Sequence, residues 1–178
     1  MKIAETVTFG GSGLDRAAQM RGQADALRAQ DNARAIVLWR GKPLISGDEL
    51  MRLPMDHPVI ADAATSMIFL GREGETPVFA ADLSGWSPAG LDDEALDSFL
   101  DLSEQLHPAV PDAAFAELRV IMTRLSPRDA ELAATAKAVM EWHRSHRFCA
   151  RCGVESKMAM GGWQRDCPAC GGHHFPRT

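Results

Sequence analysis

The sequence predicts an α+β fold in two parts, an N-terminal domain of mixed sheet and helix at residues 1–141 and a small cysteine-rich module at residues 142–178. Apolar runs of strand length fill the first half of the chain, helix-forming patterns follow them, and all four cysteines gather near the carboxyl end. With 178 residues, 46% of them hydrophobic and 24% charged, the chain is long enough for one domain of ordinary size and a small second one.

Two pairs of strands are expected in the first half of the chain. Residues 35–40, AIVLWR, predict a buried strand, and a Gly-Lys-Pro turn leads to a short partner at 43–46, PLIS. Residues 66–70, SMIFL, and 77–83, PVFAADL, predict the second pair. The residues that join this pair, GREGET, are polar and contain glycine, as a hairpin requires.

Three helices are expected after these strands. Residues 91–106 have leucines near helical spacing and acids in the first turn, where the helix dipole favours negative charge. Residues 112–125 place several large apolar side chains on one helical face. The third helix begins at Ser126, because Ser at the N-cap is followed by Pro and then by an acid, and it runs to about His146.

Charge is distributed unevenly between the two parts. Residues 142–178 carry six basic and two acidic side chains, whereas residues 1–141 carry 13 basic and 22 acidic ones. The acidic first part argues against a nucleic-acid footprint over the whole chain. No apolar run reaches the roughly 18 to 20 residues that a membrane span needs, and the N-terminus lacks the apolar region of a secretory signal. We therefore expect a cytoplasmic protein that makes no membrane contact.

The cysteines form the pattern C-x2-C-x14-C-x2-C, made by Cys149, Cys152, Cys167 and Cys170. A C-x2-C turn lets two thiolates reach one ion, and a glycine directly after each pair permits a tight turn. Two such turns complete a tetrahedron, so these four residues predict a structural Zn²⁺ site in a zinc ribbon. Four sulfur ligands leave no open position for water, so this zinc would stabilise structure and not catalyse. A redox role is the alternative, but it needs only one pair and usually a βαβ context, which is absent.

Four histidines flank the cysteines. His143 and His146 precede the first cysteine, and we expect them to pack at the helix end, where a cationic histidine is favourable. His173 and His174 follow the last cysteine, and either could contact a metal or a substrate. Because four cysteines already satisfy tetrahedral zinc, none of these histidines is needed as a ligand.

Aromatic residues near the cysteines are expected to pack rather than to react. Trp163 lies in the spacer between the two cysteine pairs, where its ring would cover the small ribbon core. Trp142 and Phe148 are expected at the junction of the two parts. The acids at 92–94 indicate a solvated helix start, and no order of Ser, His and Asp indicates a catalytic centre.

The carboxyl-terminal part resembles the NADH pyrophosphatase (NAD diphosphatase) family of Nudix hydrolases. The resemblance rests on WHRSHRFCARCG at 142–153, on Trp163 and on CPACGGHHFPRT at 167–178. It implies an N-terminal α+β domain, then a zinc ribbon, then a catalytic Nudix domain. It further implies that the whole enzyme splits NAD(H) into NMN(H) and AMP, and that some members remove NAD caps from RNA. Looser matches upstream are LDRA at 14–17, LWRG at 38–41 and AELR at 116–119.

The sequence departs from this family at its carboxyl end. It stops at Pro176-Arg177-Thr178, where the Nudix domain of the family would begin, and the Nudix box G-x5-E-x7-R-E-U-x-E-E-x-G-U is absent. The glutamates of that box hold the divalent ions, Mg²⁺ or Mn²⁺, that polarise the pyrophosphate. We therefore expect a natural or engineered fragment of such an enzyme that does not hydrolyse NAD(H) on its own.

The resemblance also implies substrate contacts. Arg119 matches a family arginine that contacts substrate, and a guanidinium suits phosphate or carboxamide recognition. Phe175 matches an aromatic residue, often Tyr in the family, that lines the substrate pocket and could stack on a base. Gly162 stands where the family commonly has a glutamate, so that contact is missing or replaced. Arg40 is a looser match to a basic family contact. The resemblance further implies a homodimer, because family members form homodimers whose subunits complete each other's pockets.

Three hypotheses for the chain follow from these patterns. The favoured one is the recognition domain and zinc ribbon of an NAD(H) diphosphatase, with NADH, NAD⁺ and NAD-capped RNA all open as substrates. The second is a stand-alone zinc-ribbon module that binds nucleic acid through the basic residues of 142–178. The third is a structural module for dimerisation.

Overall fold

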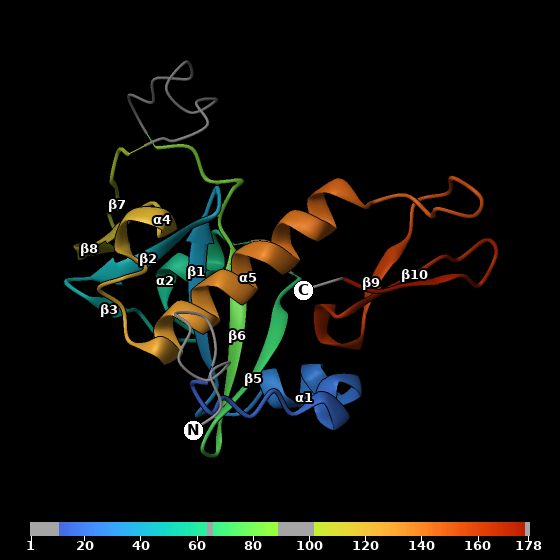
Figure 1. Cartoon of the computed structure of the whole chain (residues 1–178), viewed down its shortest axis with the longest axis horizontal. Coiled ribbons are helices and arrows are strands. Elements are labelled where there is room, and N and C mark those ends of the chain that lie inside the picture. The colour runs from blue at the N-terminus through green and yellow to red at the C-terminus, as the bar shows by residue number, and fades with distance from the viewer. Residues whose placement is uncertain (1–10, 64–65, 89–101, 177–178) are drawn as a thin grey trace.

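An eight-stranded mixed sheet forms the first part of the chain, and a separate three-stranded sheet forms its carboxyl-terminal part. The structure is a computed structural model, and it describes residues 11–63, 66–88 and 102–176. Figure 1 shows the long helix α5 (Pro127–Ser145) lying across the large sheet, with the small sheet beyond its carboxyl end. This arrangement confirms the predicted α+β class.

The large sheet has the order β5-β6-β1-β2-β8-β7, with β3 paired to β2 and β4 paired to β1. The β1–β6 pair is parallel, and the other pairs are antiparallel. All four strands expected in the first half of the chain are present, and the polar GREGET segment contributes the turn between β5 and β6. The strands are β1 (Arg34–Trp39), β2 (Lys42–Ser46), β3 (Glu49–Leu50), β4 (Leu53–Pro54), β5 (Ile68–Glu73), β6 (Thr76–Asp82), β7 (Gln105–His107) and β8 (Val110–Phe115).

Strand β1 is apolar at nearly every position because both of its faces are covered. Ile36 and Leu38 face the core under helix α5, whereas Val37 and Trp39 face a second core that includes Phe115. Successive side chains of a strand point to opposite faces, so a continuous apolar run requires two buried faces. The sheet therefore lies in the middle of the first part, with apolar packing on both sides.

Helix α5 begins where the sequence predicts. The hydroxyl of Ser126 accepts a hydrogen bond from the Asp129 amide over 3.1 Å, and Pro127 opens the helix. Leu132, Ala136 and Val139 of this helix are fully buried against the sheet. The other helices that the structure describes in the first part are short: η2 (Ala18–Gln23), α1 (Ala24–Arg28), α2 (Pro58–Ala61) and α4 (Leu118–Ile121). No helix in the described ranges is both long and apolar enough to cross a bilayer.

One expected helix is wrong, and another falls largely outside the described residues. The segment expected as a helix at 112–125 is strand β8 as far as Phe115, and only Leu118–Ile121 is helical. Pairing with β2, which places Leu44 opposite Phe115, overrides the helical spacing of the apolar residues. Of the helix expected at 91–106, only the last residues are described, and strand β7 begins at Gln105.

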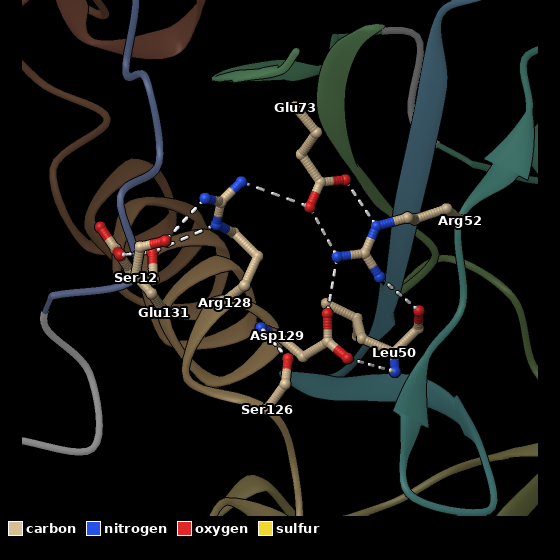
Figure 2. A network of polar contacts seen from close by, with 8 residues as sticks. All are labelled: Ser12, Leu50, Arg52, Glu73, Ser126, Arg128, Asp129 and Glu131. Atoms are coloured by element: carbon tan, nitrogen blue, oxygen red, sulfur yellow. Dashed lines mark hydrogen bonds and ion pairs between the residues drawn. The ribbon is translucent and has the colours of Figure 1, made fainter.

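A network of charged side chains ties the start of α5 to the sheet (Figure 2). The Arg52 guanidinium donates to both carboxylate oxygens of Glu73, over 2.6 and 2.8 Å, and to Asp129 over 2.6 Å. The bond to Glu73 is the main reason that the pKa of Arg52 is raised above its ordinary value. Asp129 also accepts from the Leu50 amide over 3.3 Å, and Arg128 donates to the Ser12 carbonyl over 2.6 Å. These groups satisfy one another, which indicates a structural role.

The small sheet has the order β11-β10-β9, with both pairs antiparallel. Its elements are β9 (Lys157–Ala159), the 3-10 turn η3 (Met160–Gly162), β10 (Gln164–Asp166) and β11 (His173–His174). The β9–β10 hairpin is the short hairpin that the cysteine spacing predicts between two metal-binding turns. We refer to residues 148–176 as the ribbon.

Candidate metal centre and its junction with the sheet

Two similar turns bring the four cysteine side chains together. In the first, the Gly153 amide donates to the Cys149 carbonyl over 2.8 Å, and in the second the Gly171 amide donates to the Cys167 carbonyl over 3.0 Å. Both glycines have positive φ, 76° and 66°, which an L side chain adopts only with strain. The sequence gives glycine at both places, as the predicted tight turns require.

The sulfur atoms have the spacing that one tetrahedral ion needs. All four cysteines are free thiols, and their Sγ atoms lie within 4.8 Å of one another. The Sγ atoms of Cys149 and Cys170 are 3.6 Å apart, and those of Cys152 and Cys167 are 3.4 Å apart. A tetrahedron with Zn–S bonds of about 2.3 Å has edges of about 3.8 Å, so the donor set fits zinc.

The electrostatics of the cluster also favour a cation. Burial works against ionisation of Cys149, but amide N–H groups and the His174 ring bring its pKa down to about 5. The Val154 amide favours the thiolate of Cys152, but the neighbouring thiols of Cys167 and Cys170 raise the pKa of Cys152 to about 12. Four adjacent sulfurs cannot all carry charge without a cation between them, and zinc deprotonates its thiol ligands.

The two histidines after the last cysteine have different partners. The Nε2 atom of His174 lies 3.2 Å from the Sγ atom of Cys149, at hydrogen-bond distance from that thiol. His173 points elsewhere, with its Nδ1 atom 2.7 Å from the Asp166 carboxylate, and this contact is the main reason that the pKa of Asp166 is lowered. In the described part of the chain, the group of side chains close enough to share a metal consists of the cysteines alone.

Trp163 fastens the ribbon to the large sheet. Its side chain is only 7% exposed, it belongs to the core under α5, and its indole N–H donates to the Phe69 carbonyl over 2.6 Å. The expectation that its ring covers the ribbon core is therefore wrong. A Cβ atom on Gly162 would lie 2.9 Å from Ile68, and one on Gly161 would lie 3.0 Å from Phe69, so only glycine permits this close approach.

A second contact joins the ribbon to the end of α5. Arg165 is 7% exposed, and its guanidinium donates to the Ser156 hydroxyl over 2.9 Å, to the Arg147 carbonyl over 3.3 Å and to Nδ1 of His143 over 3.0 Å. His143 Nε2 lies 2.8 Å from the Gly162 carbonyl. Since Arg165 can only donate and a carbonyl can only accept, His143 must be neutral with its proton on Nε2. Burial is the main reason that its pKa is lowered, and the charge of Arg165 adds to the shift, although the bond to the Gly162 carbonyl works against it.

The aromatic residues expected at the junction behave differently from each other. Trp142 is partly buried against the core under α5, as predicted. Phe148 is 62% exposed, so the expectation that it packs at the junction is wrong. Trp163 makes the junction contact that the sequence-based interpretation assigned to Phe148.

The structure places the expected substrate residues on different elements. Arg119 is exposed in α4, beside β8, whereas Phe175 is 61% exposed and follows β11. Figure 1 shows α4 and the ribbon strands β9 and β10 on opposite sides of α5. Arg40 lies in the turn after β1, with its guanidinium 5.4 Å from the centre of the Trp39 ring. The substrate contacts of Arg119 and Phe175 remain predictions.

Comparison with known proteins divides the chain at nearly the same place. A family model described as an NADH pyrophosphatase-like rudimentary NUDIX domain matches residues 32–142, and one described as an NADH pyrophosphatase zinc ribbon domain matches residues 144–175. The first description assigns a rudimentary Nudix character to a segment in which the sequence showed no Nudix box.

The relatives include an NAD(P)H pyrophosphatase and NAD-capped RNA hydrolases. The NAD-capped RNA hydrolase NudC of Deinococcus radiodurans is 32% identical over 150 residues, which are 84% of this chain and 44% of that protein. Human mitochondrial NAD(P)H pyrophosphatase NUDT13 is 36% identical over 89 residues, 48% of this chain and 25% of that protein. Human NAD-capped RNA hydrolase NUDT12 is 27% identical over 205 residues, 93% of this chain and 42% of that protein. The chain thus spans less than half the length of these relatives.

Proposed function

Because the chain belongs to the NADH pyrophosphatase family of Nudix proteins, we propose that it is the N-terminal and zinc-ribbon portion of an NAD(H) diphosphatase. The whole enzyme would split NAD(H) into NMN(H) and AMP. NAD-capped RNA is a further candidate substrate, since NudC and NUDT12 are named for its hydrolysis. The observation that carries this proposal is the four-cysteine cluster in a ribbon that is packed tightly against the preceding domain.

Cys149, Cys152, Cys167 and Cys170 are the residues that would hold a structural zinc ion. Bound zinc would supply the positive charge that allows four thiolates to lie together. Trp163 would orient the ribbon on the first domain. Its ring is buried in the domain core, which would fix the direction in which the chain leaves the ribbon. In this proposal the ribbon is a rigid connector between the first domain and a catalytic Nudix domain.

Two exposed side chains are proposed to contact substrate. The Arg119 guanidinium would recognise phosphate or carboxamide oxygens, and the Phe175 ring would stack on a base. Both side chains reach solvent, which supports access to a ligand. In the proposed homodimer, one subunit would complete the pocket of the other. Mg²⁺ or Mn²⁺ would be bound by the glutamates of the Nudix domain and not by the residues described here.

The alternative of a stand-alone nucleic-acid module is weaker than the sequence suggests. Of the basic residues after 141, Arg144 pairs with Glu141 over 2.6 Å and Arg147 pairs with Glu155 over 2.8 Å. Arg165 is buried inside the ribbon. Because these three guanidinium groups are paired or buried, they contribute little to a phosphate-binding surface.

The gene beyond codon 178 provides the first test. We expect a Nudix box within the next hundred or so codons, and a reading frame without one would contradict the proposal. In the protein made from the longer frame, R119Q and F175A should raise the KM for NADH with little change in kcat, because they would remove binding and not chemistry. The 178-residue chain should bind one zinc ion and should not hydrolyse NADH with Mg²⁺ or Mn²⁺. Robust turnover by the pure chain would overturn this assignment.

A further inference from the structure

A cavity of about 330 Å³ lies between the first helices, the large sheet and the ribbon. Helix η2 contacts η3 here, which closes one side of the cavity, and α1 and β6 form the other sides. Figure 1 shows η2 and α1, in blue, on the same side of β5 as the ribbon hairpin. The wall of the cavity includes two arginines and four large apolar residues: Arg21, Arg28, Met67, Phe79, Met158 and Met160. We refer to it as the Arg21 cavity.

Arg21 has no acidic partner and no side-chain hydrogen bond among the residues that the structure describes. Its guanidinium carbon lies 3.9 Å from the centre of the Trp163 ring, and its Nε atom is buried without an acceptor. The neighbouring arginines differ, because Arg16 pairs with Glu131 over 2.9 Å and Arg28 pairs with Asp25 at 4.0 Å. Buried donors in native proteins are almost always hydrogen-bonded, so an unpaired guanidinium beside a cavity is a candidate to bind an acceptor from outside the chain.

The stacking of Arg21 on Trp163 determines what that acceptor can be. Stacking occupies one face of the guanidinium plane, and the N–H groups at the edge of the plane stay available for an acceptor that lies in that plane. Carboxylates and phosphates fit this edge with two parallel hydrogen bonds. Burial lowers the pKa of Arg21, and the nearby charge of Arg16 lowers it further, so a doubly charged anion would gain more here than a neutral ligand.

The rest of the wall combines apolar side chains with a paired acid. Met67, Phe79 and Met158 present apolar surface, whereas Asp25 lies on the wall and pairs with Arg28. Arg21 therefore carries the uncompensated charge of the cavity. We propose that the Arg21 cavity binds a phosphate group, either free or carried by a nucleotide, with the edge of the Arg21 guanidinium donating to the phosphate oxygens. This site is separate from Arg119 and Phe175 and requires no hydrolase activity, so it goes beyond the function proposed above.

Amide NMR of the purified chain tests this proposal with three probes: inorganic phosphate, AMP and adenosine. Gly161 and Gly162 line the cavity, and the glycine region of the spectrum is well separated, so their amide signals report binding. We expect phosphate and AMP to shift both signals to saturation with a Kd of about 1 mM or tighter, and adenosine to shift neither. Tenfold tighter binding of AMP would identify a nucleotide as the source of the phosphate, and equal binding would identify free phosphate.

Variants link the binding to the guanidinium. R21Q removes the charge and should weaken AMP binding at least tenfold, whereas R144Q removes an equal charge from an exposed, paired arginine of α5 and should leave binding unchanged. If R21Q unfolds, R21K provides a second test, because it keeps a cation at the Trp163 ring but lacks the planar edge. R21K should bind AMP several-fold more weakly than the wild type does. Absence of saturation at about 10 mM phosphate and AMP, adenosine binding as tight as AMP, or full binding by R21K would overturn the proposal.

Discussion

The indole N–H of Trp163 donates a hydrogen bond to the main-chain carbonyl of Phe69 over 2.6 Å, and this bond joins the ribbon to strand β5. The same indole ring lies in the core under α5. The ribbon is therefore held from two sides, by metal-binding turns at its base and by the domain core at its hairpin. The position of the ribbon on the sheet should depend on Trp163 as much as on the metal.

Replacing Trp163 should destabilise the first domain and not only the ribbon. W163F keeps an aromatic ring but removes the N–H donor to Phe69, and it should lower the free energy of unfolding by about 1 kcal/mol. W163A also leaves a cavity and should lower it by about 3 to 5 kcal/mol. Urea unfolding followed by circular dichroism measures both changes, with W142F at a partly buried position as the control. A W163A chain whose sheet unfolds at the wild-type urea concentration would show that the ribbon does not support the domain.

Acidification should loosen the contact between His143 and Arg165. The pKa of His143 is lowered in the folded chain, mainly by burial, so the unfolded chain binds the proton more readily. The contribution to stability is complete above about pH 6.5, the ordinary pKa of histidine, and declines as the pH falls below it. H143Q should remove this part of the dependence, because a glutamine amide can accept from Arg165 and donate to the Gly162 carbonyl at every pH.

Urea midpoints for the wild type and H143Q between pH 8 and pH 5 provide the measurement. Loss of zinc at low pH affects both proteins equally, so the difference between the two curves isolates His143. Parallel curves would contradict the assignment of a neutral His143.

Removal of the metal should release the ribbon while the large sheet persists. The ribbon is too short to bury a core of its own, so a strong chelator should abolish the protection of amides at 148–176. The parallel pair of β1 and β6 contains no part of the ribbon and should keep its protected amides. Hydrogen exchange with mass spectrometry compares the two regions, and C149S should reproduce the effect of the chelator. Unchanged protection at 148–176 after verified metal removal would be inconsistent with a metal-dependent ribbon.

Arg52 should be the most sensitive member of the charge network. R52A leaves Glu73 and Asp129 partly buried without their shared partner, so the free energy of unfolding should fall by roughly 3 kcal/mol. R124A removes an exposed arginine that pairs with Asp48 over 3.3 Å, and it should cost less than about 1 kcal/mol. Thermal or urea unfolding of both variants gives the comparison. Equal losses would show that the Arg52 pairs are no stronger than a surface ion pair.

The metal centre could be predicted from the sequence because its geometry is local. Two C-x2-C turns with glycine after each pair determine most of the cluster, and the hairpin between them brings the pairs together. Helix α5 was equally predictable, because Ser126 and Pro127 form a start signal within a few residues. In both cases the interactions that decide the structure join residues close together in the chain.

The rest depends on contacts between distant residues. The helix expected at 112–125 rested on Phe115 and the apolar residues after it, but pairing with β2 and β7 makes the chain a strand as far as Phe115. Trp163 contacts Phe69, which lies in the other part of the chain, so its position in the spacer suggested the wrong core. The buried position of Arg165 could have been predicted from the sequence. Arg165 lies two residues before the buried Cys167, so the alternation of side chains along an extended chain places both on the same face. Nothing in the sequence distinguished Arg21 from the other arginines.

X-ray absorption at the zinc edge of the purified chain tests the central claim most directly. The account predicts one zinc ion per chain with four sulfur neighbours at about 2.3 Å and no nitrogen or oxygen neighbour. A metal-free chain, a cluster oxidised to disulfides, or a zinc ion with nitrogen in place of one sulfur would contradict the assignment of Cys149, Cys152, Cys167 and Cys170 as its four ligands.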